Sequence, residues 1–130
     1  MQCACLVAPE KSGLLIFREM TDNGIEIVVL EAFEKGARIG ARLLNHLIVA
    51  SKEQQKSYLT ATTTNDNWPA LRFYQKYGFH LHELRKGAVD EARSKLKPKI
   101  PIIGYDELPI RDEIELRLVI AGSVENLHEN

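Results

Sequence analysis

The first third of the chain alternates hydrophobic and polar positions in short runs, a pattern that predicts β-strands. β-Branched and aromatic residues fill these runs, and glycine, proline and asparagine separate them. Asn23-Gly24, between the second and the third run, indicates a hairpin turn, because both residues tolerate positive φ. The predicted strands are Gln2–Ala8, Leu14–Met20 and Ile25–Phe33.

The period of the hydrophobic pattern changes after Gly36. Ile39, Leu43 and Leu47 fall on one stripe, with the charged residues elsewhere, which predicts an amphipathic helix ending near Lys56. Strand-like and helix-like segments then take turns, and this order predicts an α/β (α+β-like) fold with one mixed sheet flanked by helices. The later segments are a strand over Tyr58–Thr64, a helix over Trp68–Tyr77, a strand over Phe79–Arg85, a short helix over Ala88–Leu96, a proline-rich loop over Lys97–Pro109 and a strand over Glu113–Ile120.

The helix predicted from Trp68 has boundary residues at both ends. Asn65-Asp66-Asn67 offers side chains that cap the first amides of a helix, and Pro69 fits the first turn. Gly78 is the residue type that ends helices, because glycine adopts the left-handed conformation without strain. The helix is therefore expected to begin beside this polar run and to stop at Gly78.

Composition indicates one globular domain that covers residues 1–130. The chain is 45% hydrophobic and 27% charged, which argues against disordered and low-complexity proteins. The net charge of -1 and the pI of about 6.4 argue against a broad nucleic-acid surface. The apolar runs are too short for a membrane span and no leader-like segment is recognisable. We therefore expect a cytoplasmic protein that binds neither nucleic acid nor membrane.

The cysteines and histidines form no metal or disulfide pattern. Cys3 and Cys5 lie two positions apart on one predicted strand, a spacing that rarely forms a disulfide, so reduced thiols are expected. His80 and His82 can share a strand face, but the sequence places no third ligand near them. No metal site is predicted.

The segment that joins the third strand to the long helix has the composition of an anion site. Amides in the first turn of a helix have no internal partner and lie at the positive end of the helix dipole. Small residues let a phosphate approach these amides, and Lys35, Arg38 and Arg42 add positive charge. Phosphate binding is one interpretation of this segment, but a Gly-x-x-x-Gly spacing is a weak signal by itself, and glycines that only mark a helix start would look the same. The segment consists of Glu34, Lys35, Gly36, Ala37, Arg38, Ile39, Gly40 and Ala41.

A second stretch, Thr63 to Phe79, carries a more specific motif. Its Asn67, Ala70, Phe73-Tyr74 and Gly78-Phe79 match the pattern Asn-x-x-Ala-x-x-(Phe/Leu)-Tyr-x-x-x-Gly-Phe. Together the two stretches resemble the GNAT superfamily of N-acetyltransferases, whose pyrophosphate loop reads (Arg/Gln)-x-x-Gly-x-(Gly/Ala). The resemblance covers residues 25–118 and is closest to small bacterial members.

The resemblance implies a mixed, mostly antiparallel sheet with a splayed pair of parallel strands. It implies acetyl-CoA as the co-substrate, with no metal, and direct attack of an amine on the thioester without an acyl-enzyme. The implied acceptor is a small-molecule or peptide amine. A homodimer is the default expectation, because most soluble oligomers are symmetric assemblies of one chain.

The resemblance also implies roles for individual residues. Tyr74 matches the general acid that protonates the coenzyme A sulfur, and would otherwise be an aromatic at the edge of the core. Asn67 matches the residue near the pantetheine arm and can equally be a helix cap. Glu26 and Glu31 are alternative general bases, or else solvated strand carboxylates. The main-chain amides expected to hold the acetyl carbonyl and the pyrophosphate are those of Val29, Leu30, Lys35, Gly36, Ala37, Arg38, Ile39, Gly40 and Ala41.

The chain departs from the family pattern in three respects. Lys35 stands where the family has Arg or Gln and keeps the positive charge. Arg38 stands at the central glycine of the loop, where its side chain can crowd the pyrophosphate or turn toward a phosphate. The family's N-terminal strand and helices, which wall the acceptor site, are expected to be absent. A non-catalytic coenzyme A-binding or protein-interaction module is therefore the alternative to an N-acetyltransferase.

Overall fold

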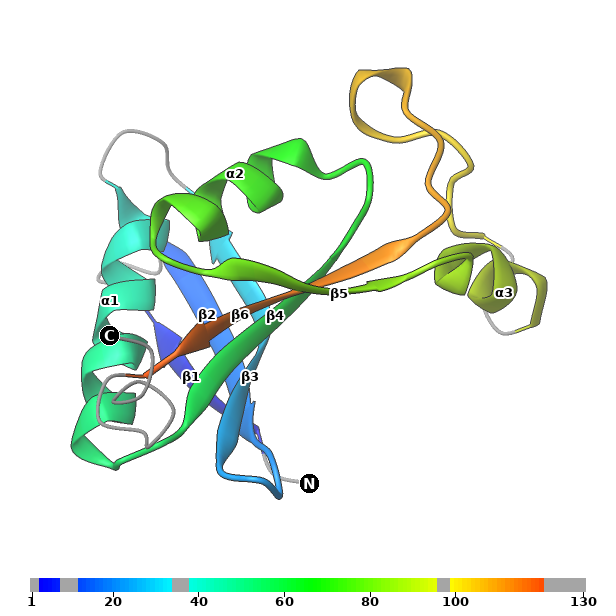
Figure 1. The fold of residues 1–130 in the computed structure, drawn as a ribbon. Helices are drawn as coiled ribbons and strands as arrows, with labels where there is room; N and C mark the ends of the chain where they lie inside the picture. The colour runs from blue at the N-terminus through cyan, green and yellow to red at the C-terminus, as the bar shows by residue number, and fades with distance from the viewer. Residues whose placement is uncertain (1–2, 8–11, 34–37, 96–98, 121–130) are drawn as a thin grey trace. The chain divides into compact units, whose positions relative to one another are not determined.

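The computed structural model describes residues 3–7, 12–33, 38–95 and 99–120. Within them lie six strands, three α-helices and one 3₁₀ turn (Figure 1). All nine predicted strands and helices are present, with bounds within three residues of the prediction. The strands are β1 (Cys3–Val7), β2 (Gly13–Glu19), β3 (Gly24–Ala32), β4 (Tyr58–Thr64), β5 (His80–Arg85) and β6 (Glu113–Val119). The helices are α1 (Ile39–Glu53), α2 (Trp68–Lys76) and α3 (Ala88–Lys95), and the 3₁₀ turn η2 is Tyr105–Glu107.

The strands form one mixed sheet in the order β1-β2-β3-β4-β6-β5. β3 and β4 are parallel, and the other neighbouring pairs are antiparallel. The mixed, mostly antiparallel sheet that the resemblance implied is confirmed. The chain divides into two compact units, Met1–Thr60 with Val119–Asn130 and Ala61–Leu118. Since the division falls within β4 and β6, both strands continue along the chain from one unit into the other.

In the first unit, the β1-β2-β3 meander carries α1 on one face. α1 contacts β2 and β3, and its predicted leucine stripe is buried. Gly13 makes this approach possible, because a Cβ there would lie 2.4 Å from Cγ2 of Ile39 and 3.1 Å from Cδ1 of Leu43. Alternation along β2 puts the fully buried Leu15 on the same face. The face of β2 with Gly13 and Leu15 is therefore the one that α1 covers.

The β2–β3 turn forms as predicted, but only one of its two central residues has positive φ. Asn23 has a φ of 68°, and the amide of Met20 donates to the carbonyl of Gly24 at 2.8 Å. Gly24 begins β3 and does not have positive φ. The position requires glycine for space instead, because a Cβ would lie 2.2 Å from Cζ of Tyr58.

In the second unit, β5 and β6 pair antiparallel and α2 packs against β5. Phe79 and Leu116 are buried in this unit. Gly78 has a φ of 100° and directly follows the C-cap of α2, as predicted. The left-handed glycine ends the helix and lets the chain turn into β5.

A register shift at His82 places the charged side chains of β5 on one face of the sheet and its leucines on the other. Leu81 and Leu84 both pair with apolar residues of β6, although their separation of three would put them on opposite faces of a regular strand. Glu83 and Arg85 pair with glutamates of β6. The irregularity therefore gathers charged groups on one face and leucines on the other.

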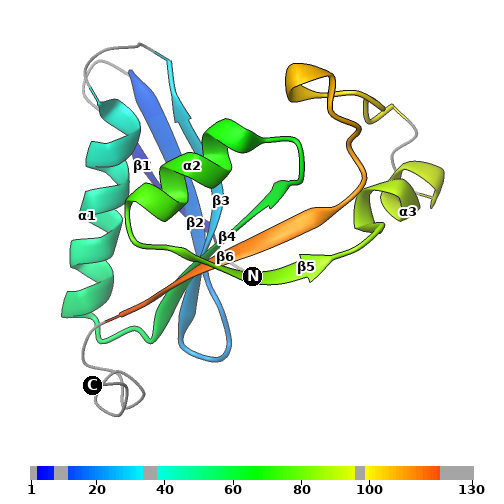
Figure 2. The same ribbon diagram turned by 45° about the horizontal axis from the view of Figure 1, so that its top comes forward.

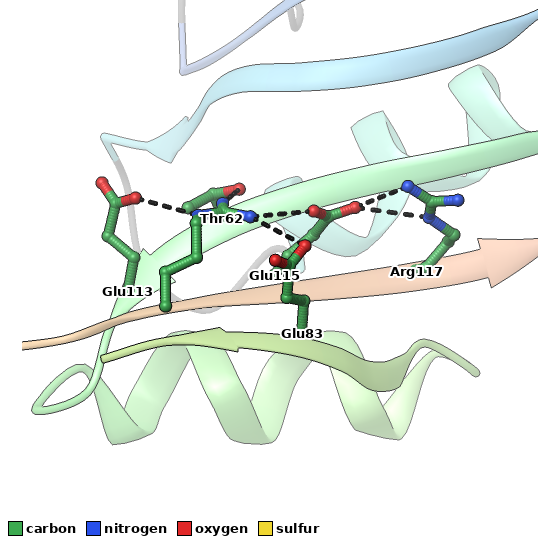
Figure 3. Close-up of polar contacts among 6 residues, drawn as sticks. Thr62, Glu83, Glu113, Glu115 and Arg117 are labelled. Carbon is green, nitrogen blue, oxygen red and sulfur yellow. Dashed lines mark hydrogen bonds and ion pairs between the residues drawn. The ribbon is translucent and has the colours of Figure 1, made fainter. Parts of the chain in front are cut away.

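The guanidinium of Arg85 contacts residues of three strands on this charged face (Figure 3). Desolvation lowers the pKa of Arg85, but hydrogen bonds to Glu115 and Glu113 outweigh it and leave the pKa above its usual value. Glu115 also pairs with Arg117 at 2.8 Å. Arg85 thus links β4, β5 and β6 through Thr62 at 3.2 Å, Glu83 and Glu113 at 3.3 Å and Glu115 at 3.1 Å.

The proline-rich segment between α3 and β6 forms an ordered excursion, as the sequence predicts. Ile103 bridges Pro109, and the amide of Ile110 donates to the carbonyl of Ile102 at 2.8 Å. This part of the chain, named here the 102–110 hairpin, is the yellow-to-orange loop between α3 and β6 in Figures 1 and 2. Its tip is η2.

Candidate functional site

A β-bulge interrupts the pairing of β2 with β3 at Val28. Ile16 pairs with Val29 and Phe17 with Ile27, so Val28 has no partner in β2. A bulge takes backbone groups out of the ladder and turns the following side chains to the other face. It lies directly before Val29 and Leu30, whose amides were predicted to polarise the thioester carbonyl.

The bulge brings the two candidate bases to one face of β3. Glu26 and Glu31 are five positions apart and would point to opposite faces of a regular strand. Their partners in β2 are Arg18 and Leu14, which are four positions apart and share a face. Because Gly13 lies on the other face, Glu26 and Glu31 are on the side turned away from α1.

Only one of these two carboxylates is engaged within the described chain. Nε and Nη2 of Arg18 both contact Oε1 of Glu26. Glu31 is exposed next to the last residue of β3, and its carboxylate has no ion pair or hydrogen bond with another described residue. Glu31 can therefore accept a proton without losing an existing partner.

α1 begins in the segment that was predicted to bind phosphate. Its N-cap is Arg38, whose φ of 54° and ψ of 39° are left-handed and whose side chain makes no capping hydrogen bond. The first turn, Ile39, Gly40 and Ala41, contains no acidic residue, and the amides of such a turn have no carbonyl partner inside the helix. The remaining predicted loop residues, Lys35, Gly36 and Ala37, lie outside the described residues.

α2 begins at Asn67, as the motif predicts. Oδ1 of Asn67 accepts a hydrogen bond from the amide of Ala70 at 3.2 Å, and Pro69 lies in the first turn. The capping role of Asn67 is confirmed. A contact between this side chain and a pantetheine arm stays a prediction.

The side chains of Asn65 and Asp66 do not cap α2, which corrects the expectation for the whole polar run. Oδ1 of Asn65 accepts from the amides of Arg111 and Asp112, both at 2.9 Å. Asp66 accepts from Oγ1 of Thr64 at 2.5 Å and from the amide of Tyr105 at 3.1 Å. The two side chains hold the segment before β6 and the 102–110 hairpin instead.

Tyr74 has a buried ring and a hydroxyl without a described partner. The residue is 8% exposed, and its ring centroid lies 5.3 Å from that of Phe73 and 5.1 Å from that of Phe79. Burial raises the pKa of Tyr74 to about 12. The hydroxyl makes no hydrogen bond with another described residue, and it is not one of the fully buried atoms that lack a partner, so solvent or a ligand can reach it. The phenol is protonated at neutral pH and can donate to a bound group.

The described residues contain no group of three His, Cys, Asp or Glu side chains placed as metal ligands are. His80 and His82 are exposed on β5, with the register shift at the latter. Cys5 is an exposed thiol outside any disulfide. None of the helices within the described ranges is long and apolar enough to cross a membrane.

Sequence reasoning missed the bulge at Val28. Ile27-Val28-Val29 has the composition of an uninterrupted strand, and no glycine or proline marks the irregularity. The available signal was the odd spacing of Glu26 and Glu31 on a strand that must bury one face. Such a spacing indicates either one inward carboxylate or an extra residue.

Comparison with known proteins supports the resemblance. The profile of the family described as Acetyltransferase (GNAT) domain matches residues 2–81. Two curated proteins of Bacillus subtilis (strain 168), described as uncharacterized proteins YxbD and YdhI, are 40% and 37% identical over 95 residues. The match covers 73% of this chain and 59% of each relative, so the chain spans about three fifths of their length.

Solved structures share the fold. An IAA acetyltransferase from Bacillus cereus ATCC 14579 is 25% identical, with a TM-score of 0.69 over 82% of this chain and 69% of that one. A GNAT family acetyltransferase from Elizabethkingia anophelis with acetyl-CoA bound is 24% identical, with a TM-score of 0.72 over 85% and 69%. An acetyltransferase of Bacillus subtilis in complex with CoA is 21% identical, with a TM-score of 0.73 over 88% and 75%. With the family profile matching more than half of its length, the chain belongs to the GNAT acetyltransferase domain family.

Proposed function

We propose that this chain is an acetyl-CoA-dependent N-acetyltransferase, built as a single GNAT domain. The observation that carries the proposal is the phenol of Tyr74, which is buried, protonated at neutral pH and without a described hydrogen-bond partner. It stands on the helix that begins at Asn67, in the motif that matches the family. Two similar structures contain acetyl-CoA or CoA, which supports the same co-substrate here.

The start of α1 has the chemistry that an anionic pyrophosphate requires. Its first turn carries no acidic side chain, and the N-cap side chain does not satisfy the amides. We assign the pyrophosphate to main-chain amides of the predicted loop, with positive charge from Lys35 and Arg38. Asn67 is assigned to the pantetheine arm. The loop amides are those of Lys35, Gly36, Ala37, Arg38, Ile39, Gly40 and Ala41.

In the proposed reaction, the amine nitrogen attacks the acetyl carbonyl carbon, a C–N bond forms and the C–S bond breaks. Amides of Val29 and Leu30, next to the bulge, stabilise the negative charge on the carbonyl oxygen. The leaving sulfur takes the proton of the Tyr74 hydroxyl, and the amine nitrogen gives up a proton to a base. Tyr74 regains its proton from solvent, so the products are the N-acetyl amine and coenzyme A.

Glu31 is the better of the two proposed bases. It is exposed and has no described partner, whereas Glu26 would have to leave the guanidinium of Arg18 to take a proton. Glu26 then serves mainly to join β2 to β3.

The acceptor is proposed to be a small-molecule or peptide amine. The net charge of -1 gives no general attraction for acidic or basic substrates. We propose action in the cytoplasm, with a homodimer as the assembly to be tested. Both kinds of acceptor carry an amine that can attack in its neutral form.

The decisive experiment is Tyr74→Phe in a coupled assay of coenzyme A release with a panel of amines. We expect kcat to fall by about 100-fold, the lower range for loss of a general acid. The dissociation constant for coenzyme A, measured by calorimetry, should change far less than kcat, because the ring and its packing are kept.

Tyr77→Phe, the same change at the C-cap of α2, is the matched control and should keep wild-type kcat. Equal turnover of wild type and Tyr74→Phe would remove Tyr74 from the mechanism. Coenzyme A binding without acetylation of any amine would support the alternative, a non-catalytic coenzyme A-binding module.

A further inference from the structure

The 102–110 hairpin exposes large apolar side chains that take no part in the core. Ile102 is 67% exposed, Ile103 52%, Tyr105 49% and Leu108 42%. Four such residues within seven positions concentrate exposed apolar side chains on one hairpin, and exposed apolar groups that gather in this way are typical of interaction sites in soluble proteins. Exposure of this kind contributes nothing to the stability of the chain by itself.

Polar groups hold the hairpin in place from several elements. The carboxylate of Asp66, which is 2% exposed, accepts the amide of Tyr105 at 3.1 Å. Gly104 is required for this contact, because a Cβ there would lie 2.0 Å from Oδ2 of Asp66. Arg93 on α3 donates to the carbonyl oxygens of Ile100, Pro101 and Ile110 at 2.7–3.0 Å. A buried carboxylate and a guanidinium thus fix a segment from which Ile102, Ile103, Tyr105 and Leu108 face solvent.

The tip of the hairpin carries two acidic residues in an unusual backbone conformation. Asp106 and Glu107 have φ of 52° and 62°, in the left-handed region that L-residues rarely adopt. Neither carboxylate has an ion pair or a hydrogen bond with another described residue. Strained positions persist where the surroundings hold them, and they concentrate at functional sites. The structure therefore presents two negative charges between Tyr105 and Leu108.

We propose that the 102–110 hairpin docks a polypeptide in which apolar side chains alternate with Lys or Arg, and that this polypeptide carries the acceptor amine. The apolar residues of the hairpin would bury those of the partner, and Asp106 and Glu107 would pair with its positive charges. That the polypeptide carries the acceptor amine rests on the proposed N-acetyltransferase activity. That the hairpin binds such a polypeptide does not.

The charge of the tip disfavours other occupants. Two hairpins meeting about a two-fold axis would bring four carboxylates together, so a second copy of this chain is a poor partner. An anionic lipid surface would repel the same two residues. A basic polypeptide satisfies both the apolar and the charged part of the surface.

The test is fluorescence anisotropy with a labelled 12-residue peptide of alternating leucine and lysine, capped at both ends, at low and high salt. We expect binding that weakens with salt, because exposed charges are screened. The double variant Asp106→Asn/Glu107→Gln and the double variant Ile102→Ser/Leu108→Ser should each weaken binding about 5–10-fold. All four positions are exposed, so these variants should fold, which thermal unfolding checks.

The matched control is Val49→Ser/Glu53→Gln, one exposed apolar and one exposed acidic residue on α1, which should bind like wild type. Equal binding by wild type and both hairpin variants overturns the proposal, as does equal binding of a leucine–glutamate peptide. A dimer that dissociates in Ile102→Ser/Leu108→Ser would assign the surface to self-association. Retention on phosphatidylcholine vesicles would assign it to a membrane.

Kinetics separate this inference from the proposed function. With a peptide amine of the same alternating pattern, the hairpin variants should raise KM and keep kcat, and with a small amine they should behave like wild type. If no amine is acetylated, the proposed function fails and the anisotropy result still decides the docking clause. If peptide and small amine respond alike to the variants, the inference fails while the N-acetyltransferase stands.

Discussion

At the scale of single residues, Tyr74 should lower the unfolding free energy as the pH rises through the alkaline range. Its pKa is about 12 in the folded chain and 10 when unperturbed, because burial disfavours the phenolate. The folded state therefore binds this proton more tightly than the unfolded state does. The resulting stabilisation is complete below pH 10 and is lost as the pH rises toward 12.

We expect wild type to lose about 2 kcal/mol more unfolding free energy than Tyr74→Phe between pH 9 and pH 11.5. Urea unfolding at several pH values measures this difference. Lysines and the other tyrosines titrate in both proteins, so the comparison isolates one phenol. Parallel stability curves for the two proteins would show that the phenol ionises in water and is not desolvated.

Arg38 is a residue whose backbone conformation suits glycine better. Its left-handed φ of 54° costs about 1–2 kcal/mol for a residue with a Cβ, while glycine adds about 0.5–1 kcal/mol of unfolded-state entropy. Arg38→Gly should therefore raise the unfolding free energy by about 0–1.5 kcal/mol. Coenzyme A affinity, measured by calorimetry, should stay equal or rise, because the guanidinium no longer stands beside the proposed pyrophosphate position.

Arg38→Ala separates these two effects. It removes the guanidinium but keeps the Cβ and its strain, so it should share the coenzyme A affinity of Arg38→Gly without the gain in stability. A large loss of coenzyme A affinity in both variants would show instead that the Arg38 side chain holds a phosphate.

Residue types predict positive φ only in part. Asn23 in a turn sequence and Gly78 after a helix were predictable, because each has a local reason for left-handed backbone. Arg38, Asp106 and Glu107 were not, since a residue with a Cβ takes that conformation only when contacts from elsewhere hold it. All three are among the positions that the proposals on function use.

At the scale of elements, the cap of α2 can be tested apart from any role of Asn67 in binding. Asn67→Ala removes the acceptor of the Ala70 amide and should lower the unfolding free energy by about 1 kcal/mol. Asn67→Asp keeps an oxygen acceptor at the helix start and should stay within a few tenths of wild type. Urea unfolding near neutral pH measures both.

Coenzyme A affinity of the same two variants tests the pantetheine contact. If the amide group of Asn67 contacts the ligand, both variants bind coenzyme A more weakly, including the one that folds with wild-type stability. Wild-type affinity in Asn67→Asp would limit this residue to capping.

The positions of the elements were predictable, and their irregularities were not. The change from a two-residue to a helical period at Ile39, and the boundary residues Asn67 and Gly78, are local signals that place helices within a few residues. The bulges at Val28 and His82 depend on the register between strands, which no local pattern encodes. The sequence therefore predicted the strands that carry Glu31 and Arg85. It did not predict the face of the sheet on which each of these side chains lies.

At the scale of the whole molecule, two strands pass between the compact units. β4 continues from Thr60 into Ala61, and β6 from Leu118 into Val119. Unfolding of one unit would break both strands in their middle and unpair the backbone groups beside the break, so we expect the units to unfold together. This cooperativity is what a single domain requires.

Hydrogen exchange can test that cooperativity and the proposed ligand at once. The amides of Leu15 and Leu116, buried in different units, should open with the same free energy. If the two amides open in one transition, coenzyme A at 100 times its dissociation constant should raise both values by about 2.7 kcal/mol. A rise at Leu116 alone would show that the two units open separately and that the unit with Tyr74 and Asn67 holds the ligand. A rise at Leu15 alone would leave the acyl transfer without its proposed acid.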